Sequence, residues 1–436
     1  MLSLAAAMLS LSSISVANPD ANRMQWWTEA RFGMFIHWDM SSIAGTEISW
    51  SRKGSKPLDI FGDPAGYVED PMYDHLYTKF DPSSFNADAW AKLAKEAGMK
   101  YVVFTSKHHD GFSMFHTKFS DYGIANTPFK RDVLKELFQA CRKEGLKVGI
   151  YYSPRDWHQP DYGAPDSSKY HAFLMGQLTE LLTNYGKIDV MWFDSFGRGD
   201  SIKYWRADEM LELVRRLQPD IIVNNRGRFY GDDNTALQGD FDTPEQRLGE
   251  FQNTRPWETC MTIVKTPDGG GWSYRSDGTV RTYEECIRSL VSCACGDGNL
   301  LLDVGPDATG VIPADQSGRL LQVGAWIKAY GDTIYKTRGG PYRNGAWGGS
   351  TYRGKSVYLH VFGWPDGDLS LPPLKAKIVS VRTIRGGKPV FSQSASGVHI
   401  LVAPSDRDPI DTVVEVKLDR SASEEMTDGH PLPGPG

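Results

Sequence analysis

The stretch ADAWAKLAKEAGMKYVVFTS, residues 87–106, decides the fold class of this chain. Its first half repeats small and apolar residues three and four positions apart, which predicts an amphipathic helix over residues 87–97. Its second half, residues 100–106, is a short run rich in β-branched and aromatic residues, which is typical of a buried strand. A helix followed directly by a buried strand is the repeating unit of a parallel α/β sheet.

The same unit recurs on both sides of this stretch. Helical patterns occupy residues 132–144 and 209–217, and further strand-like runs occupy residues 32–38, 147–153, 189–194, 221–225 and 300–304. This number of repeats favours a (β/α)8-type, TIM-like barrel spanning residues 18–335. A Rossmann sheet is the alternative α/β fold, but the chain contains no GxGxxG or Walker loop to support it.

The texture of the sequence changes after Tyr335. Short alternating runs are separated by Gly, Pro and Asp turns, which predicts a small antiparallel β-sandwich over residues 336–420. Its expected strands lie at residues 356–362, 376–384, 398–403 and 412–418. Residues 421–436 are polar and rich in Pro and Gly, so we expect a disordered tail.

The bulk composition limits the possible partners. A net charge of −6 and an isoelectric point near 6.0 argue against binding to nucleic acid or to an anionic membrane surface. Residues 2–16 are apolar and small, and Ser15-Val16-Ala17 has the small-x-small form of a cleavage site. We therefore expect a signal peptide over residues 1–17 and a secreted or periplasmic protein, whose oligomeric state the sequence does not fix.

The five cysteines lack the paired spacing of a zinc site. We expect buried free thiols, with one disulfide allowed if the protein is exported. They are Cys141, Cys260, Cys286, Cys293 and Cys295.

Polar side chains terminate five of the predicted strands. Because strand ends in a β/α barrel share one face, where active sites are built, we expect these side chains to form one site. They are His37 after the first strand, His108 and His109 after the second, Tyr152 after the third, Asp194 after the fourth and Arg226 after the fifth.

Each of these residues also has a purely structural explanation. Asp194 could cap the following helix, because aspartate is a favoured N-cap, but its place after an apolar strand and beside Trp192 favours chemistry. His37 could be an ordinary core histidine, Tyr152 a packed ring and Arg226 an ion-pair partner. The argument for a shared site is that all of these residues are expected at the same face of the barrel.

His108 and His109 could instead bind a metal, since imidazole is a common protein ligand. However, adjacent residues on a strand point to opposite faces, and no HxH or HExxH motif accompanies them. We expect them to hydrogen-bond a polyol, with no metal and no organic cofactor.

If Asp194 acts on a glycosidic bond, one reaction that a strand-end carboxylate can perform, a second carboxylate is needed, so that one attacks the anomeric carbon and the other protonates the leaving oxygen. Glu245 lies in a polar segment, FDTPE, which we expect to be a mobile loop. Glu258 opens an apolar run that predicts another barrel strand, and its neighbour Trp257 would raise its pKa, as an acid requires. Residue chemistry alone leaves both candidates open.

Six motifs between residues 26 and 313 resemble those of glycoside hydrolase family 29, the α-L-fucosidases. The segment KHHDGF and the terminal segment with its GP and DATG elements are the most specific. The motifs are RFGMFIHW, KYVVFTSKHHDGFSMF, KVGIYYSPRDWH, DVMWFD, DTPE followed by PWETCMT, and NLLLDVGPDATGVIP.

This resemblance implies a retaining exo-α-L-fucosidase with Asp194 as nucleophile and Glu245 as acid/base, Glu258 remaining the alternative. It implies a substrate that is a fucosylated oligosaccharide or glycoconjugate, with Trp272 facing the methyl group of the sugar. The residues it assigns to substrate binding are His37, Glu47, Trp50, His108, His109, Tyr152, Trp192, Arg226 and Trp272.

The chain departs from the family pattern at Asp39, at GTEISW (residues 45–50) and at Ser195-Phe196. These positions flank the expected pocket and bear on the linkage cleaved. Two rivals share the site: an α-L-galactosidase, whose sugar differs only at C6, and a catalytically inactive carbohydrate-binding protein. A metal-dependent hydrolase built on His108 and His109 is a third.

Overall fold

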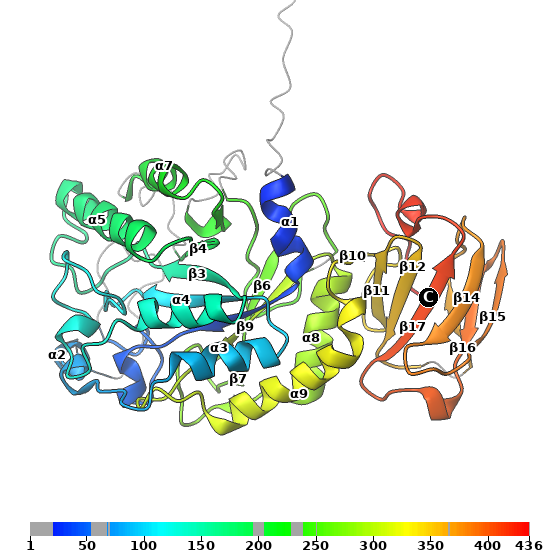
Figure 1. Cartoon of the computed structure of the whole chain (residues 1–436), viewed down its shortest axis with the longest axis horizontal. Helices are drawn as coiled ribbons and strands as arrows, with labels where there is room; N and C mark the ends of the chain where they lie inside the picture. Colours follow the sequence, from blue (N-terminus) through cyan, green and yellow to red (C-terminus); the bar gives the residue numbers. More distant parts are fainter. Residues whose placement is uncertain are drawn as a thin grey trace, which may run out of the picture.

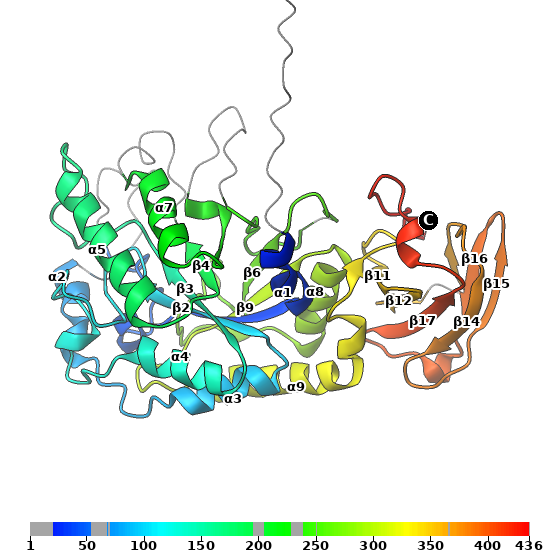
Figure 2. The same ribbon diagram turned by 45° about the horizontal axis from the view of Figure 1, so that its top comes forward.

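The computed structural model describes residues 21–53, 68, 70–194, 205–227, 239–249, 251–364 and 367–435. The expected signal peptide lies outside these residues, as do Ser195 and Phe196. Figures 1 and 2 show a curled sheet of strands with helices along its outer side, and a smaller β domain at one end of the molecule. Among the described residues, no helix combines the length and apolarity needed to cross a lipid bilayer.

Seven parallel strands form the barrel wall in the order β5-β4-β3-β2-β1-β9-β6. Met34 of β1 is in register with Val102 of β2 on one side and with Leu302 of β9 on the other. The strands read as continuous apolar runs because both faces of the sheet are covered. Their bounds are β1 Phe32–Ile36, β2 Tyr101–Lys107, β3 Lys147–Tyr152, β4 Val190–Phe193, β5 Ile222–Val223, β6 Glu258–Thr262 and β9 Asn299–Val304.

An irregular segment, residues 239–246, fills the gap between β5 and β6. Parallel bridges tie its Phe241 to Asn224 after β5, and its Glu245 to Cys260 of β6. This segment takes the eighth position in the ring, so the (β/α)8-type barrel is confirmed. It also corrects the expectation that Glu245 lies in a mobile loop, because Glu245 stands in the barrel wall.

Helices cover the outer face of the sheet, and α3 lies beside both α4 and α9 (Figure 1). Capping residues set where they begin: Asn86 accepts the amide of Ala89 at the start of α3, and Asp132 accepts that of Lys135 at the start of α4. The three predicted helices correspond to α3, α4 and α7. Within the described residues, the helices are α1 Ala21–Ala30, α2 Asp70–Asp74, α3 Ala87–Glu96, α4 Val133–Lys143, α5 Ser168–Asn184, α7 Ala207–Leu217, α8 Tyr283–Cys295 and α9 Ala314–Tyr330.

Strand alternation divides the buried residues of the sheet into two sets. Met34 packs outward against the helices, whereas Phe35 and Tyr151 point into the barrel. Trp27 of α1 joins the inner set and lies 4.6 Å from the ring of Phe241. Helix α1 therefore closes the N-terminal end of the barrel, and the opposite end stays open.

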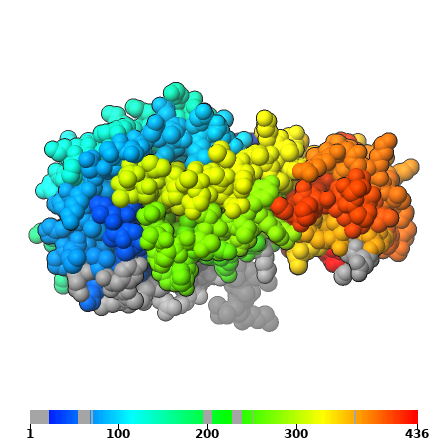
Figure 3. Space-filling view, turned by 90° about the horizontal axis from the view of Figure 1, so that it is seen from below, coloured from blue at the N-terminus to red at the C-terminus, as the bar shows by residue number. Residues whose placement is uncertain are grey.

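The C-terminal domain is the predicted antiparallel β-sandwich. A five-stranded sheet, β10-β11-β12-β17-β14, faces a three-stranded sheet, β13-β16-β15, across one apolar core. Figure 3 shows this domain, in orange and red, beside the yellow segment that contains α9. The strands are β10 Arg338–Gly339, β11 Gly348–Arg353, β12 Ser356–Val361, β13 Leu369–Leu371, β14 Ile378–Thr383, β15 Val390–Ser394, β16 Gly397–Leu401 and β17 Thr412–Leu418.

Residues 421–435 differ from the expected disordered tail. They form a short 3-10 turn, Ala422–Glu425, and then run back along the sandwich. The Glu425 carboxylate accepts the amides of Lys375 and Ala376 at 2.7 Å each. Leu432 also pairs with Tyr342 through the backbone, so the polar, Pro- and Gly-rich composition of this segment does not correspond to disorder.

Candidate active site

A cavity of about 400 Å³ opens at the C-terminal ends of the barrel strands. This is the face where β/α barrels build their active sites. Every residue assigned to the site from the sequence lines it, except Glu47, Tyr152 and Glu258. The lining residues are Phe35, His37, Trp50, His108, His109, Tyr151, Arg155, Trp192, Asp194, Arg226, Glu245, Cys260 and Trp272.

Asp194 follows the last residue of β4 and presents its carboxylate to the cavity. The Tyr151 hydroxyl donates to Oδ2 at 2.7 Å, and Arg226 Nη1 donates to Oδ1 at 3.1 Å. Burial alone would raise the pKa of this carboxyl, but the positive charge of Arg226 and the Tyr151 hydrogen bond hold it below its usual range. Asp194 is therefore ionised at neutral pH, as a nucleophile must be.

Arg226 joins the two candidate catalytic carboxylates. Its Nη2 lies 2.9 Å from Glu245 Oε2, while its Nη1 holds Asp194. Thr243 fixes the guanidinium from behind, accepting a hydrogen bond from Nε at 2.8 Å, and the group lies 4.6 Å from the centre of the Trp192 ring. The side chain of Glu245 is 39% exposed, against 15% for Asp194, so a leaving group or water can reach Glu245.

Glu258, the alternative acid, lies at the other end of the barrel. It is the first residue of β6 and fully buried, and it accepts hydrogen bonds from the Tyr101 hydroxyl and Trp192 Nε1. Burial raises its pKa to about 7, so the raised pKa suggested by the sequence is present. Glu258 does not line the cavity, however, and Glu245 is the carboxylate that accompanies Asp194.

Three histidines line the cavity, each with Nδ1 engaged. His108 Nδ1 shares a hydrogen bond with Ser49 Oγ, and His109 Nδ1 with Ser153 Oγ, both at 2.6 Å. Burial lowers the pKa of both imidazoles well below the usual value, so they are neutral. With Nδ1 occupied, Nε2 is the ring nitrogen available to a sugar hydroxyl.

His37 is oriented by a residue that sequence reasoning missed, Asp303 of β9. The His37 Nδ1 and Asp303 Oδ1 atoms lie 2.7 Å apart, and both side chains are buried. Burial lowers the pKa of His37 to about 3 and raises that of Asp303, so the pair shares one proton and carries no net charge. The motif NLLLDVGP contained this residue, but only the parallel pairing of β1 with β9 brings it to His37.

His108, His109 and Asp194 come close enough together to be considered as metal ligands, since their ligand atoms lie within 4.8 Å of one another. The Asp194 carboxylate already accepts hydrogen bonds from Tyr151 and Arg226. A guanidinium in contact with the carboxylate repels a second cation. The arrangement therefore suits a neutral polyol better than a metal ion.

Tyr152 was wrongly assigned to the substrate, and Tyr151 takes its place in the cavity. The Tyr152 hydroxyl donates to Gln177 Oε1 at 2.8 Å, outside the barrel wall, and the Lys107 ammonium lies 4.7 Å from its ring centre. Neighbouring residues on a strand face opposite sides. Both tyrosines are buried, so the sequence pattern gave no sign of which one faced inward.

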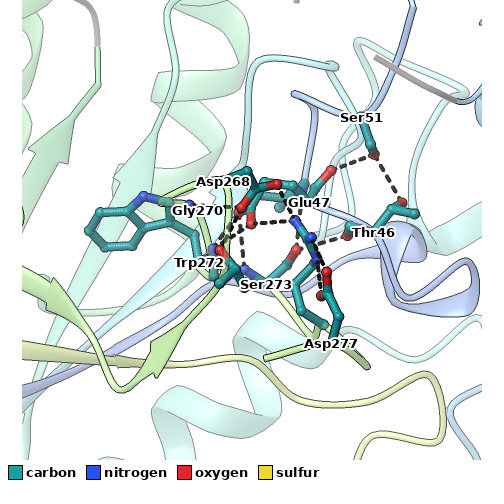
Figure 4. A network of polar contacts seen from close by, with 12 residues as sticks. Thr46, Glu47, Ser51, Asp268, Gly270, Trp272, Ser273 and Asp277 are labelled. Carbon is teal, nitrogen blue, oxygen red and sulfur yellow. Dashed lines mark hydrogen bonds and ion pairs between the residues drawn. The ribbon is translucent and has the colours of Figure 1, made fainter. Parts of the chain in front are cut away.

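Glu47 was also assigned to the sugar, but it lies behind the cavity wall. Its carboxylate accepts the backbone amides of Gly271 at 2.6 Å, Trp272 at 3.1 Å and Ser273 at 3.3 Å (Figure 4). Trp272 itself lines the cavity. Trp50, predicted from the same segment, lines the cavity as well and packs edge-on against His109 at 5.4 Å.

Two carboxylates joined by one arginine on a barrel rim, surrounded by neutral hydrogen-bonding imidazoles and aromatic rings, fit a glycoside hydrolase. The family model described as alpha-L-fucosidase matches residues 11–332. The chain belongs to this family, glycoside hydrolase family 29, and is an α-L-fucosidase by class.

Known relatives agree across nearly the whole chain. Plasma alpha-L-fucosidase of Homo sapiens is 31% identical over 406 residues, covering 86% of this chain and 85% of that protein. The structure of alpha-L-fucosidase isoenzyme 1 from Paenibacillus thiaminolyticus superposes with a TM-score of 0.80 at 34% identity, covering 91% of this chain and 99% of that one. A Bacteroides thetaiotaomicron fucosidase, trapped as a covalent intermediate with 2-fluoro-fucosyl fluoride, gives a TM-score of 0.81 at 28% identity, covering 95% and 100%.

Proposed function

We propose that this chain is a retaining exo-α-L-fucosidase that removes terminal fucose by double displacement, with Asp194 as nucleophile and Glu245 as acid/base. The observation that carries the proposal is the bridging of both carboxylates by Arg226 at 3.1 and 2.9 Å. Retention requires carboxyl groups about 5–5.5 Å apart, and one guanidinium shared between them is compatible with that spacing.

In the first displacement, an Asp194 oxygen attacks the anomeric carbon while the bond to the leaving oxygen breaks. Glu245 gives its proton to that oxygen, and a fucosyl ester of Asp194 remains. The ester removes the negative charge of Asp194. Arg226, which already contacts Glu245 at 2.9 Å, then has Glu245 as its remaining carboxylate partner.

In the second displacement, Glu245 takes a proton from water as the water oxygen attacks the anomeric carbon and the ester bond breaks. Asp194 is released as a carboxylate, again held by Arg226 and Tyr151. The covalent intermediate trapped in the Bacteroides fucosidase supports this course for a protein of the same fold.

The remaining cavity residues support binding of one fucosyl unit. The neutral Nε2 atoms of His37, His108 and His109 suit sugar hydroxyls, because they can accept or donate a hydrogen bond without carrying charge. Trp50 and Trp272 supply flat apolar surfaces. Fixing the sugar between these groups orients its anomeric carbon toward Asp194.

The test compares matched glutamate variants. Glu245→Gln should lower kcat on a substrate with a poor leaving group by about 10²–10⁴-fold, the usual contribution of a general acid. Glu258→Gln, a carboxylate of the same chain outside the cavity, should keep kcat within a few-fold. The opposite ranking would overturn the assignment of the acid.

The nucleophile is tested separately. Asp194→Gly should lower kcat by roughly three or more orders of magnitude, and azide should restore part of the turnover of an activated aryl fucoside. The anomer released first by the wild-type enzyme, read by NMR, should be the α form. Near-wild-type activity of Asp194→Gly would refute the mechanism and leave the metal-hydrolase alternative, whereas a wild-type protein that binds fucosides without hydrolysing them would favour the catalytically inactive one. Loss of activity with a chelator would favour the metal-hydrolase alternative.

We also propose export, on the apolar segment of residues 2–16 and the cleavage-like Ser15-Val16-Ala17. The five cysteines are buried free thiols, so the described fold does not depend on an oxidising compartment. Protein recovered from the medium or periplasm should begin at Asn18. Intact Met1 on the cellular protein would contradict export.

A further inference from the structure

The loop that carries Trp272 receives little support from its own secondary structure. It connects β7 Val264–Lys265 with β8 Thr279–Val280, a hairpin of two paired residues on each side. So short a ladder cannot by itself fix the position of a side chain midway along residues 266–278. The position of Trp272 must be set by contacts outside the hairpin.

Glu47 supplies those contacts through the loop backbone. The three successive amides of residues 271–273 all point at its carboxylate, as Figure 4 shows. Ser273 adds a second attachment: its Oγ donates to the Thr46 carbonyl at 3.1 Å and accepts the Ile48 amide at 2.8 Å. The loop is therefore tied at consecutive residues to one short segment after β1.

The approach is close enough to require glycine. A Cβ on Gly270 would come within 2.7 Å of Glu47 Oε2, and Gly271 has a φ of +97°, in the region that favours glycine. The sequence GGG before Trp272 thus lets the backbone reach the carboxylate. Neither Gly270 nor Gly271 lines the cavity, so the need for glycine here comes from the contact with Glu47.

A buried carboxylate is costly unless its oxygens are satisfied. Glu47 is 5% exposed, and burial raises its pKa to about 7, although the three amides and the nearby Arg275 act in the opposite direction. Arg275 Nη1 lies 3.8 Å from Glu47 and pairs on the outer side with Asp268 and Asp277. Since Glu47 does not line the cavity, we attribute its burial to the hydrogen bonds that it accepts from the amides of residues 271–273.

Trp272, whose backbone Glu47 binds, forms part of an apolar corner of the cavity. The Trp272 ring centre lies 5.0 Å from that of His37 and 6.1 Å from that of Phe35, which it meets edge-on. Trp192 also packs against Phe35, with ring centres 5.1 Å apart, and lies beneath Arg226, whereas Trp50 packs beside His109. A 6-deoxy sugar has one apolar substituent, its methyl group, and this corner is the surface that matches it.

We infer that Glu47 is a positioning residue: it anchors the backbone of residues 271–273, holds Trp272 against Phe35 and His37, and so sets the preference of the cavity for a 6-deoxy sugar. The inference rests on the proposed function. It replaces direct contact between Glu47 and the sugar with an action through Trp272.

The experiment uses kcat and KM for aryl α-L-fucoside and aryl α-L-galactoside, which differ only by a hydroxyl at C6. Glu47→Gln keeps the size of the side chain, but its amide nitrogen cannot accept a hydrogen bond. The fucoside-to-galactoside ratio of kcat/KM should fall about tenfold, as expected for losing one hydrogen bond to a charged group. The change should lie mainly in KM for the fucoside.

Trp272→Ala should lower the same ratio on its own. Adding Glu47→Gln to Trp272→Ala should change the ratio further by less than about twofold, because the two residues act through one contact. Asp277→Asn, in the outer part of the same network and 52% exposed, is the control and should leave the ratio unchanged.

An unchanged ratio in Glu47→Gln, or effects that multiply in the double variant, would overturn the inference. If Glu47→Gln does not fold, Ser273→Ala removes the second attachment and should lower the ratio in the same direction; an unchanged ratio there would also refute it. A wild-type enzyme inactive on the fucoside would instead refute the proposed function, so the two failures are distinguishable.

Discussion

At the scale of single residues, the site depends on how charge is distributed around one carboxylate. Asp194 is buried, yet Arg226 and Tyr151 keep it ionised. The imidazoles around it are neutral because burial lowers their pKa values. The cavity therefore holds two guanidinium groups, those of Arg155 and Arg226, two carboxylates and several uncharged hydrogen-bonding groups, a balance suited to an uncharged sugar.

The pH dependence of activity follows from the lowered pKa of Asp194. The nucleophile is active when ionised, so the acid limb of kcat/KM should lie below the ordinary aspartate value of about 3.9. Arg226→Met removes the main charge that lowers this pKa, and should move the acid limb to higher pH. A pH–rate profile on an aryl fucoside measures the acid limb of the wild-type enzyme and that of Arg226→Met.

An acid limb that stays in place in Arg226→Met would show that another group controls it. The lowered pKa of Asp194 also makes folding stability depend on pH. Asp194 stabilises the folded state above its unfolded pKa, and this stabilisation is lost as the pH falls through its folded pKa.

At the scale of elements, the pleat of β3 separates a tyrosine that faces the cavity from one that faces the outer helices. Tyr151 points into the barrel and donates to Asp194, whereas Tyr152 points outward and donates to Gln177. The two residues are identical in type, adjacent and equally buried. Their different roles come entirely from the face of the strand on which each lies.

The pair makes a matched prediction. Tyr151→Phe should lower kcat by about tenfold, the effect of losing one hydrogen bond to a charged group, with little loss of stability. Tyr152→Phe should leave kcat unchanged and cost about 1 kcal/mol of unfolding free energy. Kinetics and denaturant unfolding of both variants decide the matter, and a larger loss of kcat in Tyr152→Phe would reverse the assignment.

At the scale of the whole molecule, a buried ion-pair cluster joins the barrel to the β-sandwich. Arg31, directly before β1, donates to Asp297 at 2.6 Å and to the carbonyl of Thr337. Asp297 also pairs with Arg338 of β10, the first strand of the sandwich. Burial would raise the pKa of Asp297, but the two guanidinium groups hold it below its usual range.

Breaking this cluster should destabilise the fold without touching the site. Arg31→Met removes the buried guanidinium that pairs with the Asp297 carboxylate, and should lower the free energy of unfolding by about 3–5 kcal/mol. Arg338→Met, whose side chain is 54% exposed, should cost less than about 1 kcal/mol. Urea unfolding measures both, and kcat at 25 °C should be unchanged in each. Equal losses of unfolding free energy in the two variants would mean that the buried Arg31–Asp297 pair contributes no more than the exposed Arg338–Asp297 pair.

Much of the fold and the centre of the site could be predicted from the sequence because their signals are local. Helices and strands follow from the spacing of apolar residues, and most of the barrel strands were placed within a few residues. Asp194, His37, His108 and His109 were found because each ends a strand, and parallel strands bring such ends to one face.

Contacts between distant segments were decided only by the tertiary structure. Glu245 lies in a polar segment and Glu258 opens an apolar run, and neither pattern shows which one reaches Asp194. The closure of the barrel by residues 239–246 puts Glu245 at its rim, and the start of β6 puts Glu258 at its floor. Asp303 meets His37, and Glu47 meets the Trp272 loop, across more than two hundred residues. The sequence determined which side chains could do the chemistry, whereas long-range strand pairing determined which of them share the cavity, because pairing partners are not encoded in local spacing.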